Sequence, residues 1–142
     1  MPGAFDFVMT EHAAWLPASR GVRRVFAAPG GGRWLASVDG GTLTLGPLST
    51  TAAEPARDVF TLPEGLSIVP ELVAALHGLG RVVRFRNSDL WDAIGTAVIR
   101  QVIRAGQSKK LYRACCEAYG ERARLPDGGT YALSRNLRLC SG

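Results

Sequence analysis

A cluster of basic and amide side chains near residue 105 is the group best suited to chemistry with another molecule. Arginine and lysine neutralise phosphates, and glutamine and serine donate hydrogen bonds to phosphate oxygens. The pattern therefore indicates contact with a nucleic-acid backbone, with an ordinary solvated helix face as the alternative interpretation. The cluster contains Arg100, Gln101, Arg104, Gln107, Ser108, Lys109, Lys110 and Arg113.

Two amphipathic helices must position this cluster. Apolar residues recur at helical spacing over 91–102 and again over 111–118, and residues 105–106 interrupt the pattern. Asn87 or Ser88 is suited to cap the first helix. The start of the second helix would present N–H groups and a positive dipole end to a phosphate.

The remaining chain predicts mainly strands, with a helix over residues 68–79. The sequence therefore predicts an α+β fold, in which an N-terminal antiparallel β-sheet lobe precedes about three α-helices. Residues 1–80 would form the β lobe with its linking helix, 81–125 the first helices of a helical domain, and 126–142 an irregular tail. The predicted strands lie near residues 5–9, 22–26, 32–38, 42–45 and 59–62, with a hairpin turn at 39–41.

Charge is divided unevenly along the 142 residues, which carry a formal net charge of +5. Residues 1–80 contain five basic and seven acidic residues, whereas residues 81–142 contain twelve basic and five acidic ones. A basic half of this kind favours a polyanionic partner. No apolar run reaches the ~20 residues of a membrane helix, and the N-terminus has no signal-peptide pattern. The expected location is the cytoplasm.

Three further patterns predict structural roles. Cys115 and Cys116 are adjacent on an alanine-rich helix, which is typical of small buried or boundary residues and does not match metal-ligand spacing. His12 and His77 show no spacing to a partner, so packing or surface roles are expected. The glycine-rich segment 29–33 lacks the ending of a phosphate-binding loop and is expected to be a hairpin turn. We therefore expect neither a metal nor a cofactor.

Residues 89–121 read Asp-Leu-Trp-Asp-Ala-Ile-Gly-Thr-Ala-Val-Ile-Arg-Gln-Val-Ile-Arg-Ala-Gly-Gln-Ser-Lys-Lys-Leu-Tyr-Arg-Ala-Cys-Cys-Glu-Ala-Tyr-Gly-Glu. This stretch resembles the opening of the helix–hairpin–helix DNA glycosylase domain, particularly the alkylpurine (3-methyladenine) branch. The resemblance implies a role in base-excision repair. The implied partner is duplex DNA, either intact or carrying a damaged base. Gln101 stands at the family's first glutamine, and Val102 stands where a side chain fills the gap left by a flipped base. Because Val102 also continues the apolar stripe of its helix, core packing is an equal alternative.

The sequence departs from that family after the second helix. The hairpin and catalytic aspartate of the family would follow several helices later, and the Leu-Pro-Asp-Gly-Gly at 125–129 comes too soon after Gln101 to be that hairpin. It is expected to be a turn. Asp89 and Asp92 are expected in the first turn of a helix, where they suit its positive end. The resemblance therefore implies a truncated relative without a catalytic residue.

Three functional hypotheses follow from these patterns. The first is a DNA-binding relative or truncated form of a 3-methyladenine-type glycosylase that is not catalytic alone. The second is a protein-interaction module that forms a homodimer or binds a partner through exposed helix faces. The third is a glycosylase that becomes active with a second chain supplying the hairpin and catalytic aspartate. The sequence alone leaves open whether the chain is an enzyme.

Overall fold

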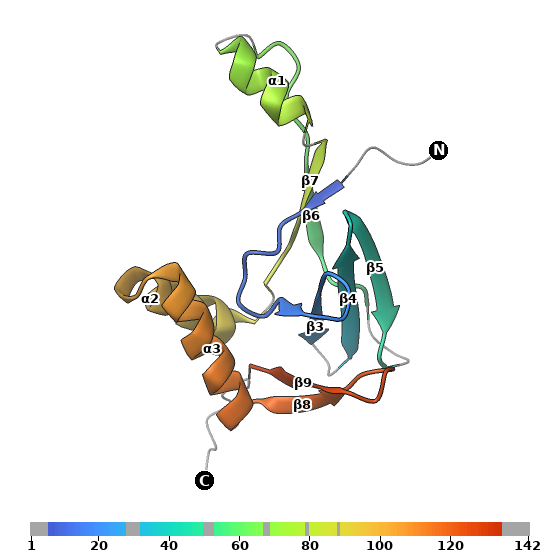
Figure 1. Ribbon diagram of the computed structural model, residues 1–142, viewed down its shortest axis with the longest axis vertical. Coiled ribbons are helices and arrows are strands. Elements are labelled where there is room, and N and C mark those ends of the chain that lie inside the picture. Colours follow the sequence, from blue (N-terminus) through green and yellow to red (C-terminus); the bar gives the residue numbers. More distant parts are fainter. Residues whose placement is uncertain are drawn as a thin grey trace.

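The computed structural model describes residues 6–27, 32–49, 53–66, 69–78, 80–87 and 89–134, and it has the predicted α+β fold (Figure 1). Within these residues, strands form three small sheets, and two of the three helices lie next to each other. In chain order the elements are β1 (Asp6–Val8), β2 (Leu16–Pro17), β3 (Val22–Ala27), β4 (Arg33–Asp39), β5 (Thr42–Pro47), β6 (Arg57–Phe60), α1 (Pro70–Gly78), β7 (Arg81–Phe85), α2 (Leu90–Val102), α3 (Ala105–Tyr119), β8 (Glu121–Arg124) and β9 (Thr130–Leu133).

The central sheet is antiparallel, with strand order β2-β3-β4-β5. The predicted hairpin between β4 and β5 is confirmed, because Asp39 pairs with Thr42 around a two-residue turn. Gly40 and Gly41 form this turn with φ angles of 55° and 83°. Two consecutive positive φ angles match the twist of a hairpin, and glycine adopts them without steric cost.

The second sheet has strand order β1-β7-β6, and it corrects the prediction of a purely antiparallel lobe. β1 pairs with β7 in parallel, whereas β6 pairs with β7 in antiparallel. β7 lies where the sequence predicts the start of the helical region, so this strand is a second correction. β6 begins two residues earlier than the strand predicted at 59–62.

A third sheet, the β8–β9 hairpin, contradicts two predictions, because β8 lies within the helical region predicted over 81–125 and β9 lies within the irregular tail predicted over 126–142. The turn expected at 125–129 is confirmed and connects the two strands, but Thr130–Leu133 forms a strand. Residues 135–142 of the predicted tail lie outside the described residues. Gly120 is needed where α3 meets this hairpin, since a Cβ there would lie 2.1 Å from the Leu133 carbonyl oxygen.

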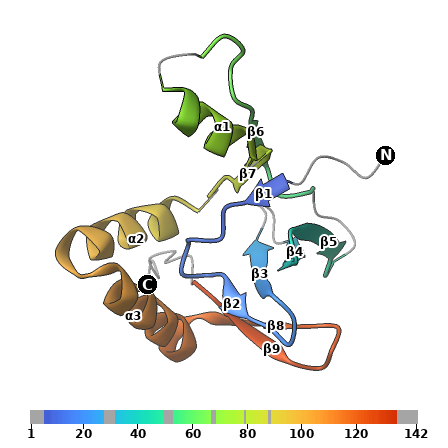
Figure 2. The same ribbon diagram turned by 45° about the horizontal axis from the view of Figure 1, so that its top comes forward.

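The core is divided between the two faces of the central sheet (Figure 2). Phe26 of β3 faces one way and packs with residues of β1 and β7, while Val25 faces the other way and packs with the β8–β9 hairpin. This arrangement follows from the alternation of side chains along a strand. The first cluster contains Val8, Trp15, Phe26, Ala36, Val83 and Phe85, and the second contains Val25, Ala123, Leu125, Tyr131 and Leu133.

The three helices lie in two separate places. α1 confirms the helix predicted over 68–79, projects beyond β6 and β7 at one end of the molecule, and has no buried residue among those described (Figure 1). α2 and α3 form a helical hairpin near β8 and β9 at the other end. The predicted basic cluster therefore lies on the α2–α3 hairpin and not on α1.

Candidate nucleic-acid interface

The turn between α2 and α3 consists of two residues with extended backbones. Ile103 ends α2, where its N–H donates to the Ile99 carbonyl at 3.1 Å. Arg104 precedes α3, and its carbonyl accepts the N–H of Ser108 at 2.9 Å. No side chain caps the start of α3 within the described structure. The N–H groups of residues 105–107 therefore have no partner inside the helix, and the positive end of α3 is presented at the turn.

Most of the predicted DNA-binding side chains surround this helix start and face solvent. Val102, the last residue of α2, is 79% exposed. Lys109 is half-buried. Ser108 does not reach the surface, because its side chain is buried and its hydroxyl donates to the Ala105 carbonyl at 2.8 Å. The exposed members of the predicted set are Arg100, Gln101, Val102, Arg104, Gln107 and Lys110.

Arg113 was predicted to belong to the same basic cluster, and this prediction is wrong. Its Nε and Nη2 atoms donate to the carbonyls of Ala13 and Trp15 at 3.1 and 3.0 Å. The side chain therefore fastens α3 to the loop between β1 and β2, and its donors are used inside the fold.

Helix α2 turns its apolar stripe toward solvent. Trp91, Ile94 and Val98 are 54%, 46% and 55% exposed, whereas Asp92 on another side of the helix is buried. The sequence offered two roles for Val102, a core position on this stripe or an exposed position facing DNA. Because the whole stripe is exposed, core packing of Val102 is excluded among the described residues.

Asp89 caps the opposite end of α2, in place of the predicted Asn87 or Ser88. Its Oδ1 accepts the N–H groups of Trp91 and Asp92 at 3.0 and 3.2 Å. Asn87 supports the cap, because its Oδ1 accepts the Asp89 N–H at 3.1 Å. Ser88 lies outside the described residues. The prediction that Asp89 and Asp92 lie at the start of the helix is confirmed.

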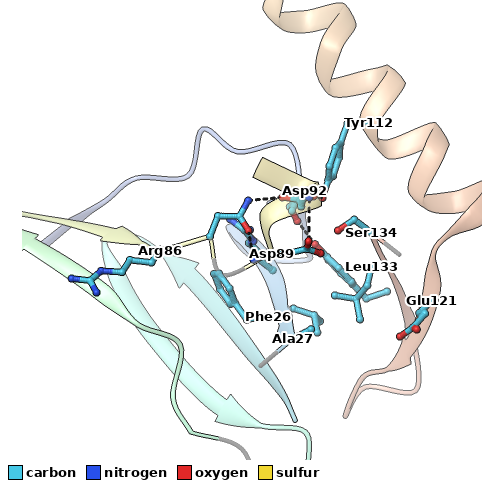
Figure 3. A pocket seen from close by; sticks show the side chains of 14 residues that line it. Phe26, Ala27, Arg86, Asp89, Asp92, Tyr112, Glu121, Leu133 and Ser134 are labelled. Atoms are coloured by element: carbon cyan, nitrogen blue, oxygen red, sulfur yellow. Dashed lines mark hydrogen bonds between the residues drawn. The ribbon is translucent and has the colours of Figure 1, made fainter. Parts of the chain in front are cut away.

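Asp92 is the centre of a buried polar network that the sequence did not reveal (Figure 3). Its Oδ1 accepts the Tyr112 hydroxyl at 2.5 Å, and its Oδ2 accepts the Asn87 amide at 2.6 Å. The same Oδ2 lies 3.0 Å from His12 Nε2. Burial alone would raise the pKa of Asp92, but the hydrogen bonds from His12, Tyr112 and Asn87 outweigh it and hold the pKa well below its usual range. The carboxylate is therefore ionised in the folded protein.

His12 lies in contact with this network, which corrects the expectation of a residue without a partner. Its Nδ1 accepts the Ala14 N–H at 3.0 Å, so the proton of the neutral ring is on Nε2, which faces Asp92. With one nitrogen accepting and the other directed at a carboxylate, the ring has no free lone pair to act as a base. Burial raises the pKa of Tyr112, so its hydroxyl stays protonated and remains a donor. The network joins four chain segments and has a structural role.

The two adjacent cysteines differ in burial. Cys116 is buried, and burial raises the pKa of its thiol to about 11, whereas Cys115 is exposed. His77 is exposed on α1. Among the described residues there is no group of three or more histidine, cysteine or acidic side chains that could hold a metal ion. Residues 29–31 of the glycine-rich segment lie outside the described part, between the paired strands β3 and β4.

Comparisons with known proteins leave the family open. No family model matches this sequence, and neither a curated protein nor a solved structure gives a match. None of the described helices combines the length and the apolar character needed to cross a membrane.

Proposed function

We propose that the α2–α3 turn binds duplex DNA, as a relative of the 3-methyladenine-type glycosylases that does not cleave bases by itself. The observation that carries this proposal is the exposure of Val102, at 79%, next to the uncapped start of α3. An apolar side chain and a set of phosphate-binding groups thus meet at one protruding turn.

The electrostatics of the turn support binding to a phosphate backbone. The free N–H groups of residues 105–107 and the positive helix end would receive one phosphate. Arg104 and Lys110 are exposed beside them and supply full charges. The first turn of α3 contains no acidic residue. A phosphate at this position would therefore meet donors and positive charge without a neighbouring carboxylate in that turn.

Val102 would act as the wedge in this proposal. Its side chain stands at the tip of α2, where it could enter the gap left by a missing or flipped base. Partial unstacking costs a few kcal/mol per step, so the wedge favours DNA that is already unstacked. An abasic duplex should therefore bind more tightly than an intact one.

The carboxylates near α2 support a role without base excision. A glycosylase of this type uses a carboxylate to stabilise positive charge on the sugar and to activate water. Asp89 is occupied as the helix cap, and Asp92 is occupied by three side chains. Both lie at the opposite end of α2 from Val102. Glycosylase activity with a second chain supplying the catalytic aspartate stays as an alternative proposal.

Fluorescence anisotropy of labelled duplexes over a salt series tests this function. We expect tighter binding to a duplex with an abasic-site analogue than to an intact duplex, and weaker binding to both as salt rises. Val102→Ala should lower the preference for the abasic duplex while keeping the salt-dependent binding. Val98→Ala is the matched control, since it removes the same atoms one helical turn away. Equal binding to both duplexes by the wild type would contradict the proposal.

The exposed stripe of α2 favours a second candidate function, which is self-association. In an antiparallel pair of α2 helices, Trp91 would face Val102 of the second copy, and Ile94 would lie near Val98 of the second copy. The ends of the two α2 helices would also be complementary. Asp89 would approach Arg104 of the second copy, and the two helix dipoles would run antiparallel. The apolar face of α2 would then pack against the same face of the second copy and would not be available to DNA.

Light scattering after size exclusion distinguishes the two candidates. Self-association through α2 predicts a dimer that Ile94→Asp converts to a monomer. Leu72→Asp is the control, because Leu72 is similarly exposed but lies on α1. A monomer at all concentrations would exclude self-association and leave DNA binding by the α2–α3 turn as the proposed function.

A further inference from the structure

A cavity of about 80 Å³ lies beside the open edge of β3 (Figure 3). β2 pairs only with Val22 and Arg23, so no strand of the described chain covers β3 from Arg24 onward on that side. The start of α2, Tyr112 of α3 and the end of β9 line the other sides. None of the exposed residues of the proposed DNA-binding turn lines this cavity.

Arg24 is the buried basic residue of this cavity. It is only 8% exposed, and its buried Nε has no hydrogen-bond partner among the described residues. Its guanidinium lies 4.4 Å from the centre of the Phe26 ring, which holds it in place over an aromatic face. Burial lowers the pKa of Arg24, and Asp92 acts on it only as a charge at a distance. A buried guanidinium without a bound anion is unfavourable, and an incoming anion would relieve this cost.

The other charged residues that line the cavity already have partners. Asp92 is held by three side chains, Asp89 accepts two N–H groups of α2, and Glu121 pairs with an arginine of β4 at 2.9 Å. Arg86 pairs with Asp58 at 2.7 Å. The acidic groups therefore have their hydrogen-bond and ion-pair partners without Arg24. The N–H donors of Arg24 are available to a ligand.

We propose that this cavity binds a small carboxylate, with Arg24 as its principal ligand. The planar guanidinium matches a carboxylate in a two-point hydrogen bond. Asn87 would supply a further donor, because its amide uses one N–H for Asp92 and has a second. A cavity of about 150 Å³ accommodates benzene, so one of about 80 Å³ has room for only a few heavy atoms. Formate and acetate are the probes of suitable size.

Thermal unfolding in acetate against chloride at equal ionic strength tests the site. We expect the wild-type melting temperature to rise by about 3 °C at an acetate concentration of about five times the dissociation constant, because binding to the folded state alone stabilises it. Arg24→Met should abolish this rise, since it removes the donors and keeps a side chain of similar length. Arg23→Met is the matched control, because the neighbouring arginine pairs with Asp127 at 2.7 Å and should leave the acetate effect intact.

Two results would overturn the proposal. An absent rise in the wild type would mean that the cavity does not bind carboxylates. An equal rise in Arg24→Met would identify a general salt effect on the protein surface. Benzoate provides a size test, since a rise as large as that of acetate would contradict a ligand of a few heavy atoms.

A second measurement tests the site in the wild-type protein and does not depend on the folding of Arg24→Met. The Nε–H resonance of Arg24 in the wild-type protein should move on addition of formate, in proportion to site occupancy. The Arg23 Nε–H resonance is the internal reference and should stay in place. Equal movement of both resonances, or of neither, would count against the site.

Discussion

The two ends of helix α2 have opposite environments. At the N-terminal end, Asp89 caps the helix and Asp92 is buried among donors from three other segments. At the C-terminal end, Val102 is exposed, and Arg104 leads into a helix start without a side-chain cap. One end has its polar groups satisfied inside the fold, and the other has them available to a partner. The satisfied end therefore fixes the orientation of the end that we propose binds DNA.

This division also explains why an apolar stripe can face solvent. The polar network at Asp92, with the Arg113 guanidinium on the carbonyls of Ala13 and Trp15, attaches the α2–α3 hairpin to the body. Specific hydrogen bonds between buried groups can fix an orientation that hydrophobic burial alone would not select. The stripe from Trp91 to Val102 is then free for DNA or for a second copy.

The largest effect on stability is expected from Asp92→Ala, at the N-terminal end of α2. The change leaves donors of His12, Tyr112 and Asn87 without their shared acceptor. Removing one partner of a buried charged network typically costs about 3–5 kcal/mol. Urea unfolding followed by circular dichroism measures the loss, with Arg104→Ala at the exposed end as the control. A loss below about 1 kcal/mol would mean that the network does not hold the hairpin.

The pH dependence of stability should follow from the same carboxylate. The pKa of Asp92 is lowered in the folded state, so an unfolded chain binds its proton more readily. The stabilisation is therefore complete above the ordinary aspartate pKa of about 3.9 and is lost as the pH falls below it.

Urea midpoints measured from neutral to acidic pH test this effect. Asp92→Asn should flatten the acid side of the profile relative to wild type. Asp58→Asn is the control, because Asp58 also has a lowered pKa through its hydrogen bond from Arg86 but lies in an exposed pair of small effect. Parallel acid limbs for wild type and Asp92→Asn would show that another group controls acid unfolding.

Several elements of the fold could be predicted from local features of the sequence. The helical period over 91–102 and the glycines at 40–41 identify α2 and the β4–β5 hairpin, because each depends on neighbouring residues alone. The sequence also predicted most of the residues that gather at the α2–α3 turn, although it wrongly included Arg113 and did not indicate that Ser108 is buried. The resemblance to the DNA glycosylases stays a prediction.

Contacts between distant segments could not be predicted in this way. His12 and Asp92 are eighty positions apart, and nothing in the local pattern of either residue indicates the other. The period of α2 reveals an apolar stripe but not whether another element covers it. β7 and β9 were missed because each is short and depends on pairing with another strand, and β propensity is strongly context-dependent.

A moderate effect on DNA binding is expected at the exposed end, from Arg104→Ala. Losing one phosphate contact should weaken binding severalfold for intact and abasic duplexes alike and should reduce the salt slope by about one. Anisotropy titrations over a salt series measure both changes. Arg57→Ala is the control, since Arg57 is exposed on β6, away from the turn. An unchanged salt slope would remove Arg104 from the interface.

The smallest effect on stability is expected from Val102→Ala, even though it removes an apolar side chain. Because Val102 is 79% exposed, folding buries little of its surface, and the change should alter the free energy of unfolding by less than about 0.5 kcal/mol. Val83→Ala is the matched comparison: Val83 is buried in the core, and the same truncation there should cost about 2 kcal/mol. Urea unfolding of both variants measures the contrast. If Val102→Ala cost as much as Val83→Ala, Val102 would be covered in solution, and the self-associating α2 face would replace the DNA wedge as its explanation.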